Sequence, residues 1–381
     1  MSSLALDLGG TFIKAAWIDG GHVREPVVRV PIPGFLKGDF DAGARELSAE
    51  DLDAAVFNAL AALEVDFDAM QRTFVSGQMA GLAYVDESGS AVGNLITWQD
   101  RRYTGVDALI HGIGDLALAD LGDGLRVGSP AVTMAQRGVP EGTYPTSLIA
   151  YVAGRIAGGR AEHVHATDAG AWGLFDTRNM RWSSEVCAEV GLDVSSLPRV
   201  VSAVEPITPG SHVFTAIGDQ QAALFGAGLN AEQVSVNLAT GCQVSVLADE
   251  FTTAVQTRPY LDSHLLHTIT HLPAGRLLTQ AISDTYGDVS DTSWDRAVAV
   301  ADGDSQIEIR SALKAIVDGV GDAVQRLNAD GREVLFSGGL VQRFTPLRDA
   351  IVDELGTPDF RAFRGDDAAL AGLAVLASQE T

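Results

Sequence analysis

Two stretches of this chain share one pattern, in which a strand, a turn of small residues and a second strand follow one another. They span residues 4–17 and 234–247. When the two are aligned without a gap, Asp7 falls on Asn237 and the turns coincide. A hairpin repeated at the start of each half predicts a duplicated α/β fold with two domains around a central cleft.

Both turns are candidates for phosphate binding. The first contains Gly10 and Thr11, and the second contains Thr240 and Gly241. Such turns present backbone N–H groups, so two of them facing each other across a cleft could hold a polyphosphate. Asp7 precedes the first turn, whereas its counterpart in the second half is uncharged, which leaves one side able to hold a metal ion.

A third stretch, residues 216–226, lies just past the midpoint. It follows a β-rich run and opens into an Ala-rich, helix-favouring run, so Asp219 is predicted where a strand gives way to a helix N-terminus. Side chains at such a position are exposed above a sheet, and backbone N–H groups there favour anionic ligands. Asp219 is therefore a candidate catalytic carboxylate, and the alternative is that it only caps the helix.

The charge of the chain restricts its partners. Its 381 residues suit two domains, and its formal net charge of −24 argues against a nucleic-acid or anionic-membrane surface. A polyanionic ligand would need a divalent cation, backbone amides and a few local basic residues. Candidates for the last are Lys14, Arg101 and Arg102.

Cellular location is predicted from what the sequence lacks. No apolar run approaches the length needed to cross a bilayer, and a strand begins almost at once at Leu4, which leaves no secretion signal. Cys187 and Cys242 are too few for a disulfide framework. We therefore expect a cytoplasmic protein.

Patterning predicts the regular elements and one boundary. Expected strands are 22–30, 73–75 and 333–336; expected helices are one capped by Ser48, 106–118, 146–156, 313–327 and one from Thr345 to Gly356. Two prolines and a glycine at 205–210 predict domains 1–209 and 210–381. The loop 31–43 and a cap at Asp366 and Asp367 are also expected.

Several loops could line a site, and each has a simpler explanation. The stretch 76–81 suggests a strand-end loop or a plain turn. Trp98 and Asp100 could hold a sugar, or the carboxylate and the two following arginines could form a solvated cluster. Asp168 could line the substrate side or cap a turn. Gly338 and Gly339 allow close approach of a ligand, or form a tight turn. The histidines at 264, 267 and 271 are not spaced for a metal site.

Taken in order, these pieces resemble the FGGY carbohydrate kinases, which have the ribonuclease H-like, actin-like ATPase fold. The matching pieces are 6–11 with Lys14, 76–79, 97–102, 167–168, 218–221, 240–242 and 337–339. They span nearly the whole chain. Among members, the chain is most similar to the ketose kinases, such as sedoheptulokinase, xylulokinase and ribulokinase, and its 218–226 run is similar to glycerol kinase.

The resemblance implies transfer of the ATP γ-phosphoryl group to a sugar or polyol hydroxyl. It implies Asp219 as the general base and Asp7 as the carboxylate that holds Mg²⁺, usually through water. The implied nucleotide contacts are Gly10, Thr11 and Lys14 in the first phosphate loop, Thr240 and Gly241 in the second, and Gly338 and Gly339 in the nucleotide-binding turn. The implied substrate contacts are Gln78, Met79, Trp98, Asp100 and Asp219.

Two departures from the family pattern affect these expectations. Many ketose kinases have His after Gln-Met, where this chain has Ala80, so the substrate could differ. The second domain is also short, because 277–283 lacks the usual glycine-rich turn and a helical segment is absent before Ser311. The nucleotide pocket is then either more open or dependent on a second subunit, as in a homodimer. Alternatives are a glycerol kinase-like enzyme and a weakened sugar- or nucleotide-binding regulator.

Overall fold

The structure is a computed structural model that describes residues 2–37, 43–65, 72–122, 124–300, 307–356, 360–362 and 367–379. Contacts group the chain into two compact units. The first comprises Met1–Gly226, Thr257–Leu265 and Asp367–Thr381, and the second comprises Ala227–Gln256 and Leu266–Asp366. The expected domains, 1–209 and 210–381, differ in their bounds from these two units. They stay a prediction. Residues 38–42 of the expected 31–43 loop and Asp366 lie outside the described residues.

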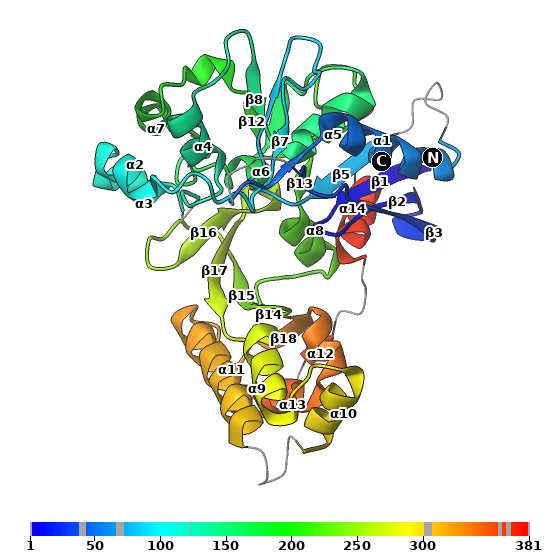
Figure 1. Ribbon diagram of the computed structural model, residues 1–381, viewed down its shortest axis with the longest axis vertical. Coiled ribbons are helices and arrows are strands. Elements are labelled where there is room, and N and C mark those ends of the chain that lie inside the picture. Colours follow the sequence, from blue (N-terminus) through cyan, green and yellow to red (C-terminus); the bar gives the residue numbers. More distant parts are fainter. Residues whose placement is uncertain are drawn as a thin grey trace. The chain divides into compact units, whose positions relative to one another are not determined.

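Five strands form the main sheet of the first unit, in the order β13-β5-β1-β2-β3 (Figure 1). They are β1 (Ser3–Leu8), β2 (Phe12–Asp19), β3 (His22–Pro31), β5 (Thr73–Gly77) and β13 (Ile217–Gly218). The first three form an antiparallel meander, which contains the predicted hairpin and the predicted strand 22–30. β5 runs parallel to β1, and β13 runs parallel to β5, so the carboxyl ends of these three strands lie at one edge.

Helices cover both faces of this sheet (Figure 1). They are α1 (Ala49–Ala62) and α5 (Leu148–Ala157) on one face, and α8 (Asp219–Gly226) and α14 (Ala368–Gln379) on the other. α8 and α14 pack backbone to backbone, because a Cβ at Gly372 would lie only 1.9 Å from the carbonyl oxygen of Ala222. The predicted cap is present, since the Ser48 side chain accepts a hydrogen bond from the Asp51 N–H.

Shorter elements extend the first unit. The strands are β4 (Glu46–Leu47), β6 (Ala83–Val85), β7 (Leu95–Ile96), β8 (Tyr144–Thr146), β9 (His163–His165), β10 (Phe175–Asp176), β11 (Arg181–Trp182) and β12 (Arg199–Val201), and β16 (Gln256–Pro259) begins at the unit boundary. The helices are α2 (Val106–Gly112), α3 (Asp115–Asp120), α4 (Pro130–Arg137), α6 (Ala166–Ala169), α7 (Ser184–Glu189), η2 (Val194–Ser196) and η3 (Leu261–Ser263). Where one helix was predicted over 106–118, two occur, because Ile113 between them has an extended backbone.

The second unit has its own sheet and core. Its strands are β14 (Gln233–Leu238), β15 (Cys242–Ala248), β17 (Leu265–Leu272), β18 (Glu333–Ser337) and β19 (Phe360–Ala362), in the order β17-β15-β14-β18-β19. Its helices are α9 (Gly275–Tyr286), α10 (Asp291–Val300), α11 (Ile307–Arg326), α12 (Gly339–Arg343) and α13 (Thr345–Leu355). Separate groups of buried apolar side chains fill the two units.

The duplication predicted from the sequence is confirmed by the matching strand order of the two sheets. Asp7 pairs with Ser76 on the parallel strand, and Asn237 pairs with Ser337 in the same way. The two hairpins differ by one residue in the register of strand pairing after the turn. Asp7 lies opposite Lys14, whereas Asn237 lies opposite Gln243, because the second turn closes one residue earlier.

Within the described part of the chain, no helix combines the length and the apolar character that crossing a membrane requires. Cys187 and Cys242 are both buried free thiols.

Candidate functional site

Strand order brings two predicted carboxylates to one edge of the first unit's sheet. Asp7 lies next to Ser76 of β5, and Ile217 of β13 flanks Ser76 from the other side. Asp219 follows β13 as the first residue of α8, as predicted. Adjacent strands are about 4.8 Å apart, so β1 and β13, which flank β5, lie about 10 Å apart.

The surroundings of these carboxylates change their acidity. Burial raises the pKa of Asp7, while Lys14 and a 3.0 Å hydrogen bond donated by the Ser76 hydroxyl act in the opposite direction. Burial and then the charge of Asp7 raise the pKa of Asp219 to about 7, against the effect of Arg258 and a hydrogen bond from the Gln220 N–H. Asp219 is therefore able to take up a proton near neutral pH.

Arg258 was not predicted as a site residue. It reaches this region from β16 and donates a hydrogen bond to the Gln220 side-chain oxygen. It lies 39 residues beyond Asp219 in the sequence, in a stretch that carries no recognisable motif, so only the tertiary fold identifies it.

The first turn is accessible, and its lysine already has a partner. Gly10 and Thr11 are exposed, and the Gly9 N–H closes the turn on the Phe12 carbonyl at 3.1 Å. The Lys14 ammonium lies 3.5 Å from the Asp367 carboxylate just before α14. The turn follows β1, and Lys14 lies on β2 opposite Asp7, while a role of these residues in phosphate binding stays a prediction.

Three predicted substrate contacts gather at the same edge. The Trp98 indole N–H donates a 2.8 Å hydrogen bond to Gln78, whose amide nitrogen lies 3.4 Å from the Gly9 carbonyl oxygen. A Cβ at Gly218 would lie 2.4 Å from the sulfur of Met79, so this thioether lies against the residue before Asp219. The Trp98 ring is 38% exposed and is available to a ligand.

Asp100 is held by its own loop. Its buried carboxylate accepts hydrogen bonds from the N–H groups of Arg45 and Arg102 and from the Arg102 guanidinium. Although burial raises its pKa, these bonds outweigh that effect and leave the pKa below its usual value. Arg102 also contacts Glu46, and Arg101 donates to the Trp98 carbonyl. The arginines are tied to the protein, and a sugar contact by Asp100 stays a prediction.

Thr167 and Asp168 lie in the short helix α6. Asp168 is fully buried, and burial raises its pKa to about 7 despite hydrogen bonds donated by Ser147 at 2.5 Å and by the Trp172 indole at 3.4 Å. The Thr167 hydroxyl accepts a hydrogen bond from the Gly218 N–H. Asp168 is thus a core carboxyl group, and Thr167 touches the strand that precedes Asp219.

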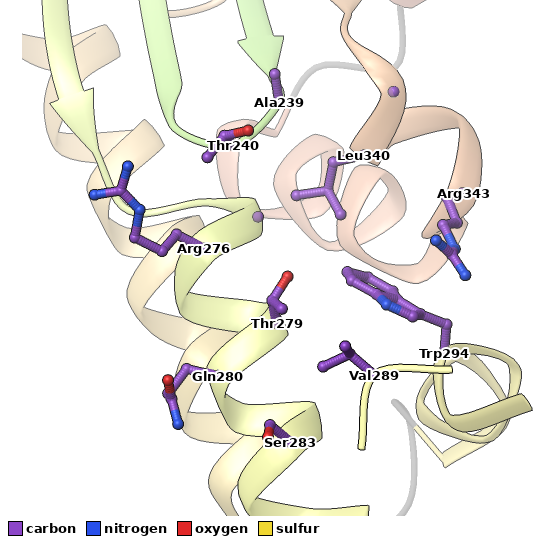
Figure 2. Close-up of a pocket in the computed structure, with 12 residues that line it drawn as sticks. Ala239, Thr240, Arg276, Thr279, Gln280, Ser283, Val289, Trp294, Leu340 and Arg343 are labelled. Atoms are coloured by element: carbon purple, nitrogen blue, oxygen red, sulfur yellow. The ribbon is translucent and has the colours of Figure 1, made fainter. Parts of the chain in front are cut away.

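The second unit contains a cavity of about 640 Å³ beside the second turn (Figure 2). Thr240 and Gly339 line it, which places members of two predicted nucleotide-binding turns at one cavity. Gly241 completes the first of these turns. Gly338 has a φ of 94°, and a Cβ there would lie 2.2 Å from the Leu238 carbonyl oxygen, so this position requires glycine.

Helix α9 begins directly against this turn. The Gly275 N–H donates to the Ala239 carbonyl at 3.0 Å, and the Arg276 N–H donates to the Thr240 carbonyl at 2.9 Å. A Cβ at Gly275 would lie 2.5 Å from the Ala239 oxygen, so this glycine permits the contact. The Arg276 guanidinium extends beside the turn (Figure 2).

The opposite wall of the cavity is aromatic. Trp294 faces it across from α9, and the Arg343 guanidinium lies over the indole at 4.6 Å (Figure 2). These residues and those of α9 were not predicted. The available signal was the helical spacing of polar residues after Gly275, which continues through Arg276, Thr279 and Ser283 on one face.

The residues at the end of β1 suit a magnesium ion. Among the described residues, no group of three or more His, Cys, Asp or Glu side chains is placed to hold a metal. Mg²⁺ does not need one, because it is usually held by one or two carboxylates together with substrate phosphates and water. A cation near Asp7 would also offset the repulsion that raises the pKa of Asp219.

Comparison with known proteins identifies the fold. No protein-family model matches the chain. A glycerol kinase of Symbiobacterium thermophilum is 31% identical over 257 residues, which are 58% of this chain and 49% of that protein. The chain spans about half the length of the curated relatives it matches.

Solved structures match along the whole chain. Xylulose kinase from Rhodospirillum rubrum superposes with a TM-score of 0.86 at 14% identity, covering 100% of this chain and 90% of that one. Plasmodium falciparum glycerol kinase, solved with ADP, gives a TM-score of 0.84 at 14% identity, covering 100% and 90%. The strand topology and these similarities confirm the actin-like fold of this chain and its resemblance to the FGGY carbohydrate kinases.

Proposed function

We propose that this protein is an ATP-dependent kinase that transfers the γ-phosphoryl group to a hydroxyl of a ketose or related polyol. The observation that carries the proposal is Asp219, which follows β13 at the sheet edge that also holds Asp7 and has a pKa of about 7. A carboxylate with this pKa matches the requirement for a general base at neutral pH.

The residues of the first unit would bind and activate the alcohol. The exposed ring of Trp98 offers an apolar surface to the C–H face of a sugar, and Gln78 orients that ring through its hydrogen bond. Asp219 would accept the hydroxyl proton as the new O–P bond forms and the bond to the ADP oxygen breaks. Ala80 in place of the usual histidine leaves the identity of the sugar open.

The cavity of the second unit supports nucleotide binding. Its volume of about 640 Å³ lies within the range of small-ligand sites. The indole of Trp294 offers a flat surface to a base, and Arg276 supplies positive charge beside the Thr240 turn. Within a chain of net charge −24, such local charge matters for a polyphosphate.

Magnesium is part of this proposal. When bound, it would neutralise charge on the transferred phosphoryl group. Asp7 would hold it, and the exposed turn formed by Gly10 and Thr11 would contact the phosphates. A cytoplasmic location, where ATP is available, belongs to the same proposal.

Glycerol is a second candidate acceptor. It is favoured by the names of the sequence relatives, which are glycerol kinases at 28% and 31% identity. A ketose remains our first choice because residues 76–79 resemble the ketose-kinase version of that loop. The two acceptors differ in size, so we expect the enzyme to prefer one of them, and a single activity assay with both shows which.

The test is ADP release measured with purified protein, ATP and Mg²⁺ against a panel of ketoses, pentitols and glycerol. A ketose or pentitol with the highest kcat/KM supports the proposal, whereas preference for glycerol supports the second candidate. Nucleotide binding by calorimetry without turnover on any alcohol would overturn the kinase assignment and favour a binding regulator.

The variant Asp219→Asn, measured in the same assay, tests whether Asp219 is the general base. We expect turnover to fall by a factor on the order of 100 to 10,000, because the base acts in the transition state. Nucleotide affinity measured by calorimetry should stay close to that of the parent. Near-normal turnover in this variant would remove Asp219 from its proposed role.

A further inference from the structure

A buried chain of hydrogen bonds begins at β13, the strand that precedes Asp219. The Gly218 N–H donates to the Thr167 hydroxyl at 3.2 Å. That hydroxyl lies 2.9 Å from His165 Nδ1, and His165 Nε2 lies 3.0 Å from the Ser202 carbonyl oxygen. His165 and Thr167 are 0% and 1% exposed, so water does not replace these bonds.

The position of β13 explains why Gly218 needs an outside partner. This strand has only two residues and lies at the end of its sheet, so β5 pairs with it on one side only. The Gly218 N–H is directed to Thr167 and is buried. Without an acceptor it would be an unsatisfied buried donor, which native structures avoid.

The proton positions along this chain follow from the carbonyl at its end. The Ser202 oxygen can only accept, so His165 Nε2 carries the proton and Nδ1 is an acceptor. Nδ1 accepts from the Thr167 N–H at 3.2 Å and from the Thr167 hydroxyl. The hydroxyl is then oriented with its lone pairs toward Gly218. Burial lowers the pKa of His165 to about 4, so the ring stays neutral and keeps this role.

A second contact fixes the helix that supplies Thr167. The next residue, Asp168, accepts hydrogen bonds from Ser147 at the start of α5 and from Trp172. The four-residue helix α6 is therefore anchored on one side to the core, while Thr167 on it reaches β13. Side chains at Gly218 are excluded by Met79 and Gln221, so the strand end has little room to move.

We propose that His165 and Thr167 are positioning residues that hold the backbone before Asp219, so that the base keeps its place at the sheet edge. This inference rests on the proposed function for its catalytic meaning. Both residues act through Gly218 and not through contact with the substrate or the nucleotide. Displacement of a catalytic group by about 1 Å can reduce a rate by about 100-fold.

Thr167→Val tests the proposal, with Thr167→Ser as its matched control. Valine keeps the shape of threonine but removes the hydroxyl, whereas serine keeps the hydroxyl. We expect Thr167→Val to lower kcat by about 10- to 100-fold while KM for ATP changes little, because the Thr167 hydroxyl contacts Gly218 and His165 and none of the residues proposed to bind the nucleotide. Thr167→Ser should retain turnover close to that of the parent. Equal loss in both variants, or unchanged kcat in the valine variant, would overturn the proposal.

Hydrogen exchange gives a readout that needs no activity. In the parent and in Thr167→Ser, the Gly218 amide should exchange slowly, and in Thr167→Val a peptide covering residues 213–224 should exchange faster. Comparable protection in Thr167→Val would contradict the role of the hydroxyl even if the protein proved not to be a kinase. His165→Asn, which offers an acceptor near the Nδ1 position, should preserve more protection than His165→Leu. Circular dichroism confirms that each variant is folded.

Discussion

The two halves of the duplicated fold end their first strands differently. In the first unit, Asp7 beside Ser76 and opposite Lys14 forms a charged strand end. In the second, Asn237 beside Ser337 and opposite Gln243 forms a neutral one. The architecture is shared, so the different chemistry of the two ends comes from a few side chains at matching positions.

The two units also differ in the buried polar side chains that they contain. Among the described residues, the buried carboxylates are all in the first unit: Asp7, Glu46, Asp100, Asp168 and Asp176. The buried polar residues of the second unit are uncharged: Gln233, Ser235, Ser245, Thr268 and Ser293. Acid–base chemistry is therefore concentrated in the first unit, while the second offers turns and an aromatic-walled cavity.

Among the variants that compare the two units, Asp7→Asn should have the largest effect, because it makes the charged strand end resemble the neutral one. We expect the Mg²⁺ affinity or kcat to fall by about 10- to 100-fold, as when a supporting metal contact is lost. Because the charge of Asp7 helps to raise the pKa of Asp219, its removal lowers that pKa. The acidic limb of kcat/KM against pH should then move to lower pH, and a shift to higher pH would contradict this coupling.

Asn237→Asp makes the neutral end resemble the charged one. The Asn237 oxygen lies 2.7 Å from where a Cβ of Gly338 would be, so a carboxylate would stand beside two nucleotide turns. Repulsion of the phosphates should raise KM for ATP by about tenfold, which corresponds to about 1.4 kcal/mol. Asn237→Ser removes the amide without adding charge and should change KM less; equal effects would show that charge is not the cause.

Alanine variants of Trp294 and Trp98 test whether the second unit binds ATP and the first unit binds the sugar. Trp294→Ala should raise KM for ATP by about three- to tenfold, because it removes the flat wall of the cavity. Trp98→Ala should raise KM for the sugar by a similar factor and leave KM for ATP unchanged. Steady-state kinetics with each substrate varied separately checks both, and crossed effects would contradict the assignment.

Asp168→Asn should give the smallest effect on activity and a clear effect on stability. The raised pKa of Asp168 favours the protonated folded form, so its contribution is present below pH 4 and is lost as pH rises toward 7. As pH rises from about 4 to about 7, the free energy of unfolding should decrease more in the parent than in Asp168→Asn. The difference between the two proteins should be on the order of a few kcal/mol. Urea unfolding across this range measures it, with exposed Asp330→Asn as the control; parallel curves for all three proteins would contradict the expectation.

Local patterns predicted the features that repeat or that join adjacent elements. The two hairpins, the Ser48 cap and the strand-to-helix passage at Asp219 all follow from neighbouring residues, and the structure contains each of them. Arg258 and the walls of the cavity were missed because they depend on packing between distant segments. The break at Ile113 was missed because the apolar spacing continues through it.

The pairing of α14 with α8 has a consequence for how the chain acquires its structure during synthesis. Residues 368–379 leave the ribosome after every segment of the second unit, yet they cover strands near the N-terminus and press a glycine against Ala222. The second unit can therefore fold before the first is complete, while the apolar surface that α14 covers in the first unit stays exposed until residues 368–379 have been synthesised. Chaperone capture of nascent chains should therefore concentrate on that waiting surface.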